Sequence, residues 1–275
     1  MSSTRPERDA ADLSRQDQLR LLRQGTLDLE GRLIDASNTT LRAEITLDDI
    51  RARCVYKPIR GERPLWDFPD GTLAGREVSA YLVAAATGWD CVPPTVLRDG
   101  PLGPGACQLW IDEPEDSDPL LGFVPVDEVP AGWHRIMRAH DSDGEPYTLA
   151  HADDVRLARL AIFDVVVNNA DRKGGHILST MDGGVRGVDH GVCFNVEPKL
   201  RTVLWGWIGD PLPAEAFEVL GKIRAELFGE LGEALADHLT IAEVAEVGAR
   251  IDALVSAGRF PAPGEDWPAV PWPPV

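Results

Sequence analysis

Hydrophobic and polar positions alternate in three short stretches near the start of the chain, which predicts three antiparallel strands. Each stretch is partly β-branched, and Ser, Asn or Asp separates it from the next, as is typical of turns. A short helix is expected before them at residues 14–24, with Ser14 as its N-cap. The strand patterns are GTLDLEGRLID, TTLRAEITL and RARCVYKPI, at residues 25–35, 39–47 and 51–59.

A helical period follows at residues 74–88, AGREVSAYLVAAATG, and Gly88 is its expected end. Two more strand patterns, at residues 95–100 and 106–113, complete a β-rich unit. Helices are predicted around residues 131–138, in HADDVRLARLAIFDVVVNN at 151–169, and over 213–257, with short strands at 176–179 and 185–188.

This order predicts an α+β fold with a β-rich N-lobe, a helical C-lobe and a cleft between them. The final stretch, PAPGEDWPAVPWPPV, is too rich in proline for regular structure, and the sequence leaves open whether it packs on a lobe or forms a loose tail. Residues 1–13 are expected to be disordered. The expected divisions are an arm and helix at 1–24, the N-lobe at 25–112, the C-lobe at 113–260 and a Pro/Trp-rich tail at 261–275.

Composition narrows the possible partners. The chain has 275 residues, 44% of them hydrophobic, and a formal net charge of -18. Such a charge repels nucleic acid and anionic membrane surfaces, so we expect neither as a partner. No apolar run reaches the roughly 18 residues that a membrane span needs, and the charged N-terminus does not resemble a signal peptide, which predicts a cytoplasmic protein. Four scattered cysteines form no C-x-x-C pair and are expected to be reduced and buried.

Four charged residues occur in an order that suits phosphoryl transfer. Lys57 ends a strand in VYKP, and Glu77 lies on the next helix in GREVSAYL. Asp171 lies in the loop NNADRKGGHIL, and Asp189 follows a short strand in GVDHGVCF. Kinases use a lysine on the ATP phosphates, a helix carboxylate that holds the lysine, a catalytic-loop aspartate and a metal-binding aspartate. Each residue alone would be an ordinary surface residue, so the prediction depends on their joint order.

The loops NNADRKGGHIL and GVDHG resemble the catalytic and metal-binding loops of the phosphatidylinositol 3-/4-kinase-like superfamily. Within it, they are similar to type II phosphatidylinositol 4-kinases and to toxin-type serine kinases of bacteria. VYKPIRGERPLWDFPDGTL, REVSAYL and DRKGGHIL further resemble an actinobacterial family of such kinase-like proteins. The resemblance covers roughly residues 25–210 and implies a bilobal protein-kinase-like fold that uses ATP with Mg²⁺ or Mn²⁺.

The resemblance also implies roles for single residues. Lys57 would contact the α- and β-phosphates of ATP and pair with Glu77, Asp171 would be the catalytic aspartate, and Asp189 would bind the metal. Asp164 and Asn168 would brace the catalytic loop. The segment Gln108, Leu109 and Trp110 would lie near the adenine, in the strand that leads to the second lobe.

Two departures from the family pattern stand out. His176 occupies the place where a second metal-binding Asn is expected, and imidazole suits Mn²⁺ better than Mg²⁺. The chain has no G-x-G-x-x-G motif; IDASNTTL stands in its place, where Ser37 and Asn38 either contact phosphate or form an ordinary polar turn. Lys173 either helps to bind the transferring phosphate or is a solvated loop lysine.

The predicted function is an ATP-dependent phosphotransferase that acts on a protein or soluble small-molecule hydroxyl. One alternative is a pseudokinase, a nucleotide-binding regulatory module, which His176 favours. Another is an AMP transferase on the same fold, because the sequence does not report the orientation of ATP. The remaining alternative is an α+β protein without a nucleotide site, since fold-level analogy alone does not establish function.

Overall fold

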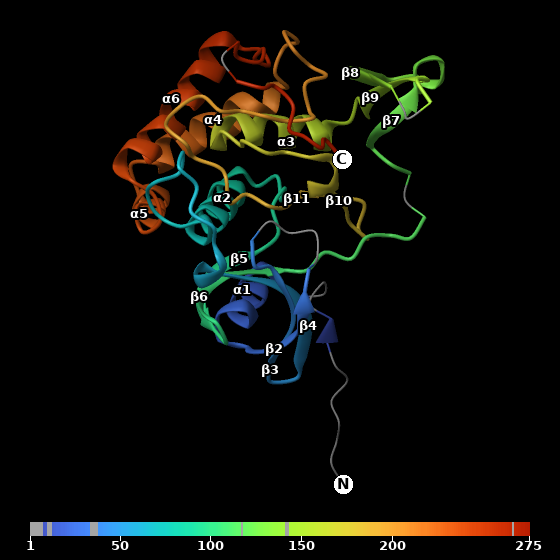
Figure 1. The fold of residues 1–275 in the computed structure, drawn as a ribbon. Coiled ribbons are helices and arrows are strands. Elements are labelled where there is room, and N and C mark those ends of the chain that lie inside the picture. Colours follow the sequence, from blue (N-terminus) through green and yellow to red (C-terminus); the bar gives the residue numbers. More distant parts are fainter. Residues whose placement is uncertain (1–7, 10–12, 34–37, 117, 141–142, 266) are drawn as a thin grey trace.

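The computed structural model describes residues 8–9, 13–33, 38–116, 118–140, 143–265 and 267–275. Figure 1 shows two lobes, a sheet-based one drawn in blue and green and a helical one drawn in yellow to red. Their α+β arrangement confirms the predicted fold class. The domain divisions at residues 24, 112 and 260 stay predictions.

The first lobe is an antiparallel sheet with the strand order β2-β3-β4-β6-β5, and a short β1 runs parallel to β4. Helix α1, Arg15–Gln24, packs against one face of this sheet, and the Ser14 side chain accepts a hydrogen bond from the Asp17 N–H at 3.2 Å, as expected of an N-cap. The five predicted strands are therefore confirmed. Their bounds are Thr26–Arg32 (β2), Leu41–Leu47 (β3), Ile50–Pro58 (β4), Thr95–Gly100 (β5) and Gly103–Leu109 (β6). Strand β1, Arg8–Asp9, was not predicted: it lies in the arm that was expected to be disordered, and it pairs with β4.

Helix α2, Leu73–Thr87, lies between the sheet and the helices of the second lobe (Figure 1). It begins at Thr72, whose hydroxyl accepts the Gly75 N–H, and ends at Gly88 with φ 72°, a left-handed conformation that glycine adopts without strain. Both ends agree with the helix predicted at residues 74–88.

A second sheet follows the first lobe in the chain and lies beside the second lobe (Figure 1), in the order β7-β9-β8, with bounds Leu121–Pro125 (β7), Trp133–His140 (β8) and Pro146–Ala152 (β9). The helix predicted at residues 131–138 is wrong, because this segment is strand β8. A bulge between Arg135 and Met137 inserts an extra residue into β8. The insertion breaks the alternation of the strand and gives Trp133, Ile136 and Met137 the three- and four-residue spacing of a helix.

The second lobe is built around α3, whose Leu157, Leu160 and Phe163 are fully buried. The hairpin of β10 and β11 lies beside it. No described helix is long and apolar enough to cross a membrane. The elements of this lobe are α3 (Val155–Val167), β10 (Ile177–Ser179), β11 (Val185–Gly187), α4 (Ala214–Glu226), α5 (Glu230–Ala236) and α6 (Ile241–Ala257).

The Pro/Trp-rich tail packs along the second lobe. The Ala269 carbonyl accepts hydrogen bonds from the Thr202 N–H at 3.0 Å and from the Trp205 indole at 2.8 Å. Near its end, the Pro274 carbonyl accepts the Gly174 N–H at 2.7 Å. Of the two possibilities that the sequence left open, the packed tail is the observed one.

All four cysteines are buried and unpaired, as predicted. Cys54 and Cys107 belong to the apolar core between the sheet and α1, whereas Cys91 and Cys193 belong to the core of the second lobe. Burial raises the pKa of Cys91 to about 12, so its thiol stays protonated at neutral pH.

Candidate active site

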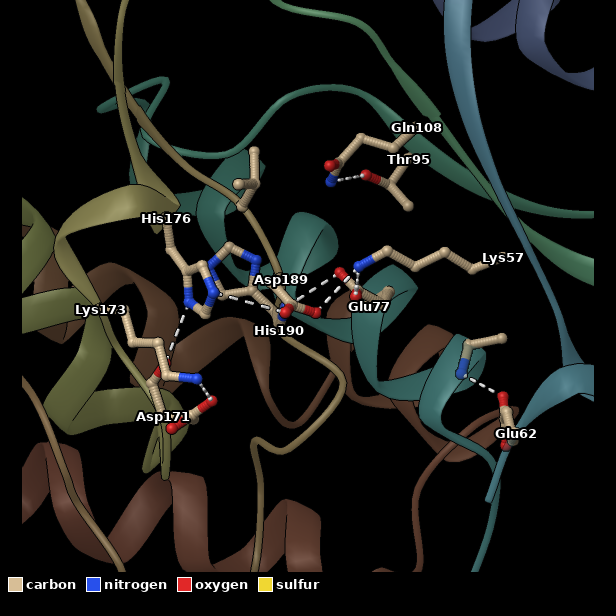
Figure 2. A network of polar contacts seen from close by, with 12 residues as sticks. Lys57, Glu62, Glu77, Thr95, Gln108, Asp171, Lys173, His176, Asp189 and His190 are labelled. Atoms are coloured by element: carbon tan, nitrogen blue, oxygen red, sulfur yellow. Dashed lines mark hydrogen bonds and ion pairs between the residues drawn. The ribbon is translucent and has the colours of Figure 1, made fainter. Parts of the chain in front are cut away.

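Three of the predicted site residues meet between the lobes (Figure 2). Lys57 comes from the end of β4, Glu77 from α2, and Asp189 from the loop after β11. The Lys57 ammonium donates hydrogen bonds to Glu77 Oε1 and, at 3.0 Å, to Asp189 Oδ1. Side-chain exposure is 22% for Lys57, 3% for Glu77 and 54% for Asp189, so only Asp189 is widely open to solvent.

The three charges strongly affect one another. Burial alone would lower the pKa of Lys57, but the carboxylates of Asp189 and Glu77 outweigh it and raise that pKa. The Lys57 ammonium holds the pKa of Asp189 well below its usual range. Burial raises the pKa of Glu77, opposed by the Lys57 charge. With all three ionised, the cluster carries one excess negative charge, which suits a cation bound beside Asp189.

The backbone at residues 189 and 190 holds the carboxylate of Glu77 in place and orients the Asp189 side chain. The His190 N–H donates to Glu77 Oε2 at 3.0 Å. Asp189 has φ 60°, in the left-handed region that Asp and Asn occupy more readily than most residues. This backbone turn lets consecutive residues face different partners, with the Asp189 side chain toward Lys57 and the His190 amide toward α2.

His176 and Asp189 form a donor pair that fits one divalent ion. His176 Nδ1 lies 3.0 Å from the carbonyl oxygen of Asp171, which can only accept, so Nδ1 carries the proton. The lone pair is then on Nε2, which lies 3.5 Å from Asp189 Oδ2. Ligands at about 2.1 Å from an ion are typically near 3 Å from each other. Burial lowers the pKa of His176, which keeps the imidazole neutral and able to ligate.

The ligand set is small. Within the described ranges, no group of three or more His, Cys, Asp or Glu side chains could hold a metal ion. Mg²⁺ and Mn²⁺ in nucleotide sites are commonly held by one or two protein ligands, with phosphate oxygens and water completing the shell. The pair of His176 and Asp189 fits that mode of binding.

Asp171 lies in the predicted loop between α3 and β10. Its N–H donates to Asn169 Oδ1 at 3.0 Å, and its carboxylate pairs with the Lys173 ammonium at 3.1 Å (Figure 2). The Asp171 side chain is 31% exposed, so a substrate group can reach it. Lys173 is therefore paired with the predicted catalytic carboxylate instead of extending into solvent.

A fully buried ion pair supports this loop. Arg172 and Asp164 have no exposed side-chain surface, and the guanidinium reaches both Asp164 oxygens. Arg172 also donates to the Val188 carbonyl at 2.8 Å and to His190 Nε2 at 2.7 Å, and so joins the loops that carry Asp171 and Asp189. Asp164 braces the loop as expected, whereas the role of Arg172 was missed. Its only signal in the sequence was its place beside Asp171.

The predicted adenine segment begins at the end of β6, the strand that pairs with β4. Gln108 shares a sheet face with Lys57 and donates to the Thr95 hydroxyl at 2.8 Å (Figure 2). The Leu109 N–H bonds the Pro94 carbonyl at 2.9 Å, and the Trp110 N–H bonds the Arg53 carbonyl at 3.0 Å, so neither donor is free for a ligand. In a regular antiparallel pair, the N–H of residue 94 would donate to the Leu109 carbonyl. Residue 94 is a proline without an N–H, so the Leu109 carbonyl does not receive this hydrogen bond.

Of the two residues considered for phosphate contact, Ser37 and Asn38, the structure describes Asn38. Asn38 Oδ1 accepts the Arg63 N–H at 2.9 Å, which ties the β2–β3 turn to the segment after β4. The Thr39 N–H reinforces the tie through the Gly61 carbonyl at 3.3 Å. Asn38 thus has a structural partner within the chain. Ser37 lies outside the described residues.

Comparison with solved structures defines the class of fold. The crystal structure of the Golgi casein kinase matches with a TM-score of 0.55 and 15% identity, over 88% of this chain and 74% of that chain. A proinflammatory kinase of Helicobacter pylori, CtkA, matches with a TM-score of 0.45 and 9% identity, over 93% of this chain and 96% of that one. The likeness to the Golgi enzyme shows that the chain has a kinase-like bilobal fold.

The sequence comparison defines the family. The chain is 50% identical over 267 residues to Protein Rv2133c of Mycobacterium tuberculosis, which covers 94% of this chain and 96% of that protein. The chain therefore belongs to the family of Rv2133c. No family model matches it.

Proposed function

We propose that this protein is an ATP-dependent, metal-dependent phosphotransferase that transfers the γ-phosphoryl group to a hydroxyl of a protein or a soluble small molecule. The observation that supports it best is the Lys57 ammonium held between Glu77 and Asp189 in a kinase-like fold. Membership of the phosphatidylinositol 3-/4-kinase-like superfamily is part of the same proposal.

Lys57 would bind the phosphates, and Glu77 would hold the Lys57 ammonium in place. Glu77 is fixed by the His190 N–H, so it can hold the ammonium while Lys57 shifts from Asp189 toward the α- and β-phosphates. Asp189 and His176 would hold Mg²⁺ or Mn²⁺. When bound there, the ion would supply positive charge to offset the negative charge of the phosphate oxygens and of the leaving ADP.

Asp171 would orient the acceptor. Its partly exposed carboxylate would accept the hydroxyl proton as the hydroxyl oxygen attacks the γ-phosphorus and the bond from that phosphorus to the ADP oxygen breaks. Lys173 already pairs with Asp171 at 3.1 Å and would share its charge with the transferring phosphoryl oxygens. The Asn169 contact to the Asp171 N–H keeps the loop in register during this step.

The adenine would lie beside Leu109. Its carbonyl lacks a return bond from Pro94 and can accept a hydrogen bond from the exocyclic amine of adenine. The Leu109 and Trp110 N–H groups are already bonded, so this segment would contribute acceptors, not donors.

The acceptor would be a soluble hydroxyl. The net charge of -18 opposes close approach to anionic lipid surfaces and to nucleic acid. A neutral imidazole beside one carboxylate favours Mn²⁺ over Mg²⁺, because Mn²⁺ accepts nitrogen ligands more readily than Mg²⁺ does.

The test is a nucleotide and metal titration of the purified protein. We expect ATP to raise Tm only with Mn²⁺ or Mg²⁺, and Asp189→Asn to abolish the rise while keeping the left-handed backbone. Label from γ-³²P-ATP that Asp171→Asn abolishes would identify a phosphotransferase. Label from α-³²P-ATP would indicate an AMP transferase, and metal-dependent binding without transfer to the protein or to a panel of acceptors would favour the regulatory module. No effect of nucleotide with either metal would refute the proposal.

A further inference from the structure

Helix α2 carries the lysine-binding glutamate but shares the main core of the second lobe. Ala80, Tyr81, Val83 and Ala84 pack in the same apolar cluster as α3, α4 and α6. The separate core between the sheet and α1 contains no residue of α2 among those described. In a small third cluster, Ala74 and Val78 meet Ala106 of β6, which gives α2 an apolar contact with the sheet as well.

Arg76, the neighbour of Glu77, extends from α2 into the second lobe. The Arg76 side chain is 2% exposed and pairs with Glu243, which is 7% exposed at the start of α6. It also donates to the carbonyls of Cys193 at 2.8 Å and Asp70 at 3.0 Å. The guanidinium carbon lies 4.9 Å from the centre of the Phe68 ring. One buried cation thus connects α2 to α6, to the segment after Asp189 and to the loop before α2.

Successive residues on a helix are about 100° apart, so adjacent side chains can serve two different surfaces. Arg76 faces the second lobe, and Glu77 faces Lys57 on the sheet. Glu243 is itself fixed, because its second oxygen accepts the Thr240 N–H at 2.8 Å in the capping box of α6. The anchor on the second-lobe side is therefore held by backbone hydrogen bonds.

We propose that Arg76 is a positioning residue that makes α2 part of the second lobe. Glu77 and Asp189 then move as one body, and the Lys57–Glu77 ion pair crosses the joint with the sheet. Opening of the cleft would change the distance from Lys57 to both carboxylates together. The consequence for nucleotide binding rests on the proposed function, whereas the anchoring of α2 does not.

The anchoring is tested by hydrogen exchange on the full-length protein without nucleotide. Arg76→Met with Glu243→Gln removes both charges and keeps the apolar stem on Phe68. We expect exchange of the α2 amides to rise at least tenfold in this variant. Ile45→Ala, in the sheet core, is expected to speed exchange in β2, β3, β4 and β6 and to leave α2 within twofold of the wild type. The anchoring would be overturned if exchange of the α2 amides rises in Ile45→Ala and stays unchanged in the Arg76 variant.

The positioning role is tested by calorimetric titration with ADP and Mn²⁺ below the melting range. We expect Kd to rise at least tenfold in the Arg76 variant. Val247→Ala, a core truncation on the same helix as Glu243, controls for general destabilisation and should stay within twofold. Unchanged affinity in the Arg76 variant would overturn the positioning role even if α2 is anchored. If the paired variant does not fold, Arg76→Lys, which keeps the charge but loses the planar fork, should raise Kd at least threefold, and unchanged affinity would again overturn the role.

The two proposals fail in different ways. A wild-type protein that binds no ADP with either metal would refute the proposed phosphotransferase. In that case, hydrogen exchange in α2 would still decide whether Arg76 joins this helix to the second lobe.

Discussion

His190 donates its backbone N–H to Glu77 Oε2 at 3.0 Å, while the Lys57 ammonium bonds the other oxygen of the same carboxylate. The residue after Asp189 therefore fixes the carboxylate that holds the lysine. This hydrogen bond links the Asp189 loop directly to Glu77.

Lys57→Met should destabilise the fold. It removes the cation between two carboxylates, and Glu77 is almost fully buried. We expect a loss of about 3 kcal/mol in the free energy of unfolding at pH 7, as is typical when one partner of a buried pair is removed. Urea denaturation measures it. Lys222→Met, at an exposed pair with Glu226, is the control and should change stability by less than about 0.5 kcal/mol. Equal effects of the two substitutions would contradict the buried-pair interpretation.

His176→Asn should shift the metal preference toward Mg²⁺. The change replaces the imidazole nitrogen beside Asp189 with an amide oxygen, a harder ligand. The ratio of the ADP affinities with Mn²⁺ and with Mg²⁺, from calorimetry, should fall at least fivefold. His140→Asn changes an exposed histidine on β8 and is the matched control. An unchanged ratio would exclude His176 as a ligand.

Lys173→Met should slow transfer without weakening nucleotide binding. Lys173 pairs with Asp171 and makes no described contact with the Lys57 cluster. We expect kcat to fall by about 10–100-fold with the KM for ATP within twofold, since its charge would act on the transferring group. The rate of γ-³²P transfer measures both quantities. If KM rises instead and kcat is kept, Lys173 binds ground-state ATP and the transition state equally and has no specific role in the chemical step.

Stability should fall as the pH drops from about 6.5 to 4, in part because of His151. Burial lowers the pKa of His151 from 6.5 to about 4. The native state therefore binds fewer protons than the unfolded state in this range, and acid favours unfolding. This shift in the pKa of His151 corresponds to roughly 3 kcal/mol in the free energy of unfolding, at about 1.4 kcal/mol per pKa unit. His151→Gln should flatten the pH dependence of the free energy of unfolding by up to about this amount. An unchanged slope would show that the native state tolerates a charged His151.

Local signals in the sequence predicted much of the fold. Ser14 and Gly88 mark helix ends because their conformations and hydrogen bonds depend only on nearby residues. The meeting of Lys57, Glu77 and Asp189 followed from chain order, since the two-lobed topology brings those three element ends together.

Long-range and irregular features could not be predicted in this way. The bulge in β8 gives a strand the hydrophobic spacing of a helix, so periodicity led to the wrong element. Arg76 and Glu243 are 167 positions apart. The pattern Thr240-x-x-Glu243 is a local sign of a capping box, but nothing local indicates that Glu243 pairs with Arg76. Asn38 was a candidate for phosphate contact because of its type, but its orientation is set by Arg63, which the turn pattern does not reveal.

The distribution of the cysteines provides a separate reporter for each lobe. Two thiols lie in the core of the sheet and α1, and two lie in the core that includes α2. A buried thiol reacts with an alkylating reagent only when its surroundings open, so the labelling rate reports the rate of that opening. Labelling of Cys54 and Cys107 would report the opening of the sheet core, and labelling of Cys91 and Cys193 would report the opening of the helical lobe. Mass spectrometry of the four labelled peptides would show in one experiment whether the two lobes unfold together or in sequence.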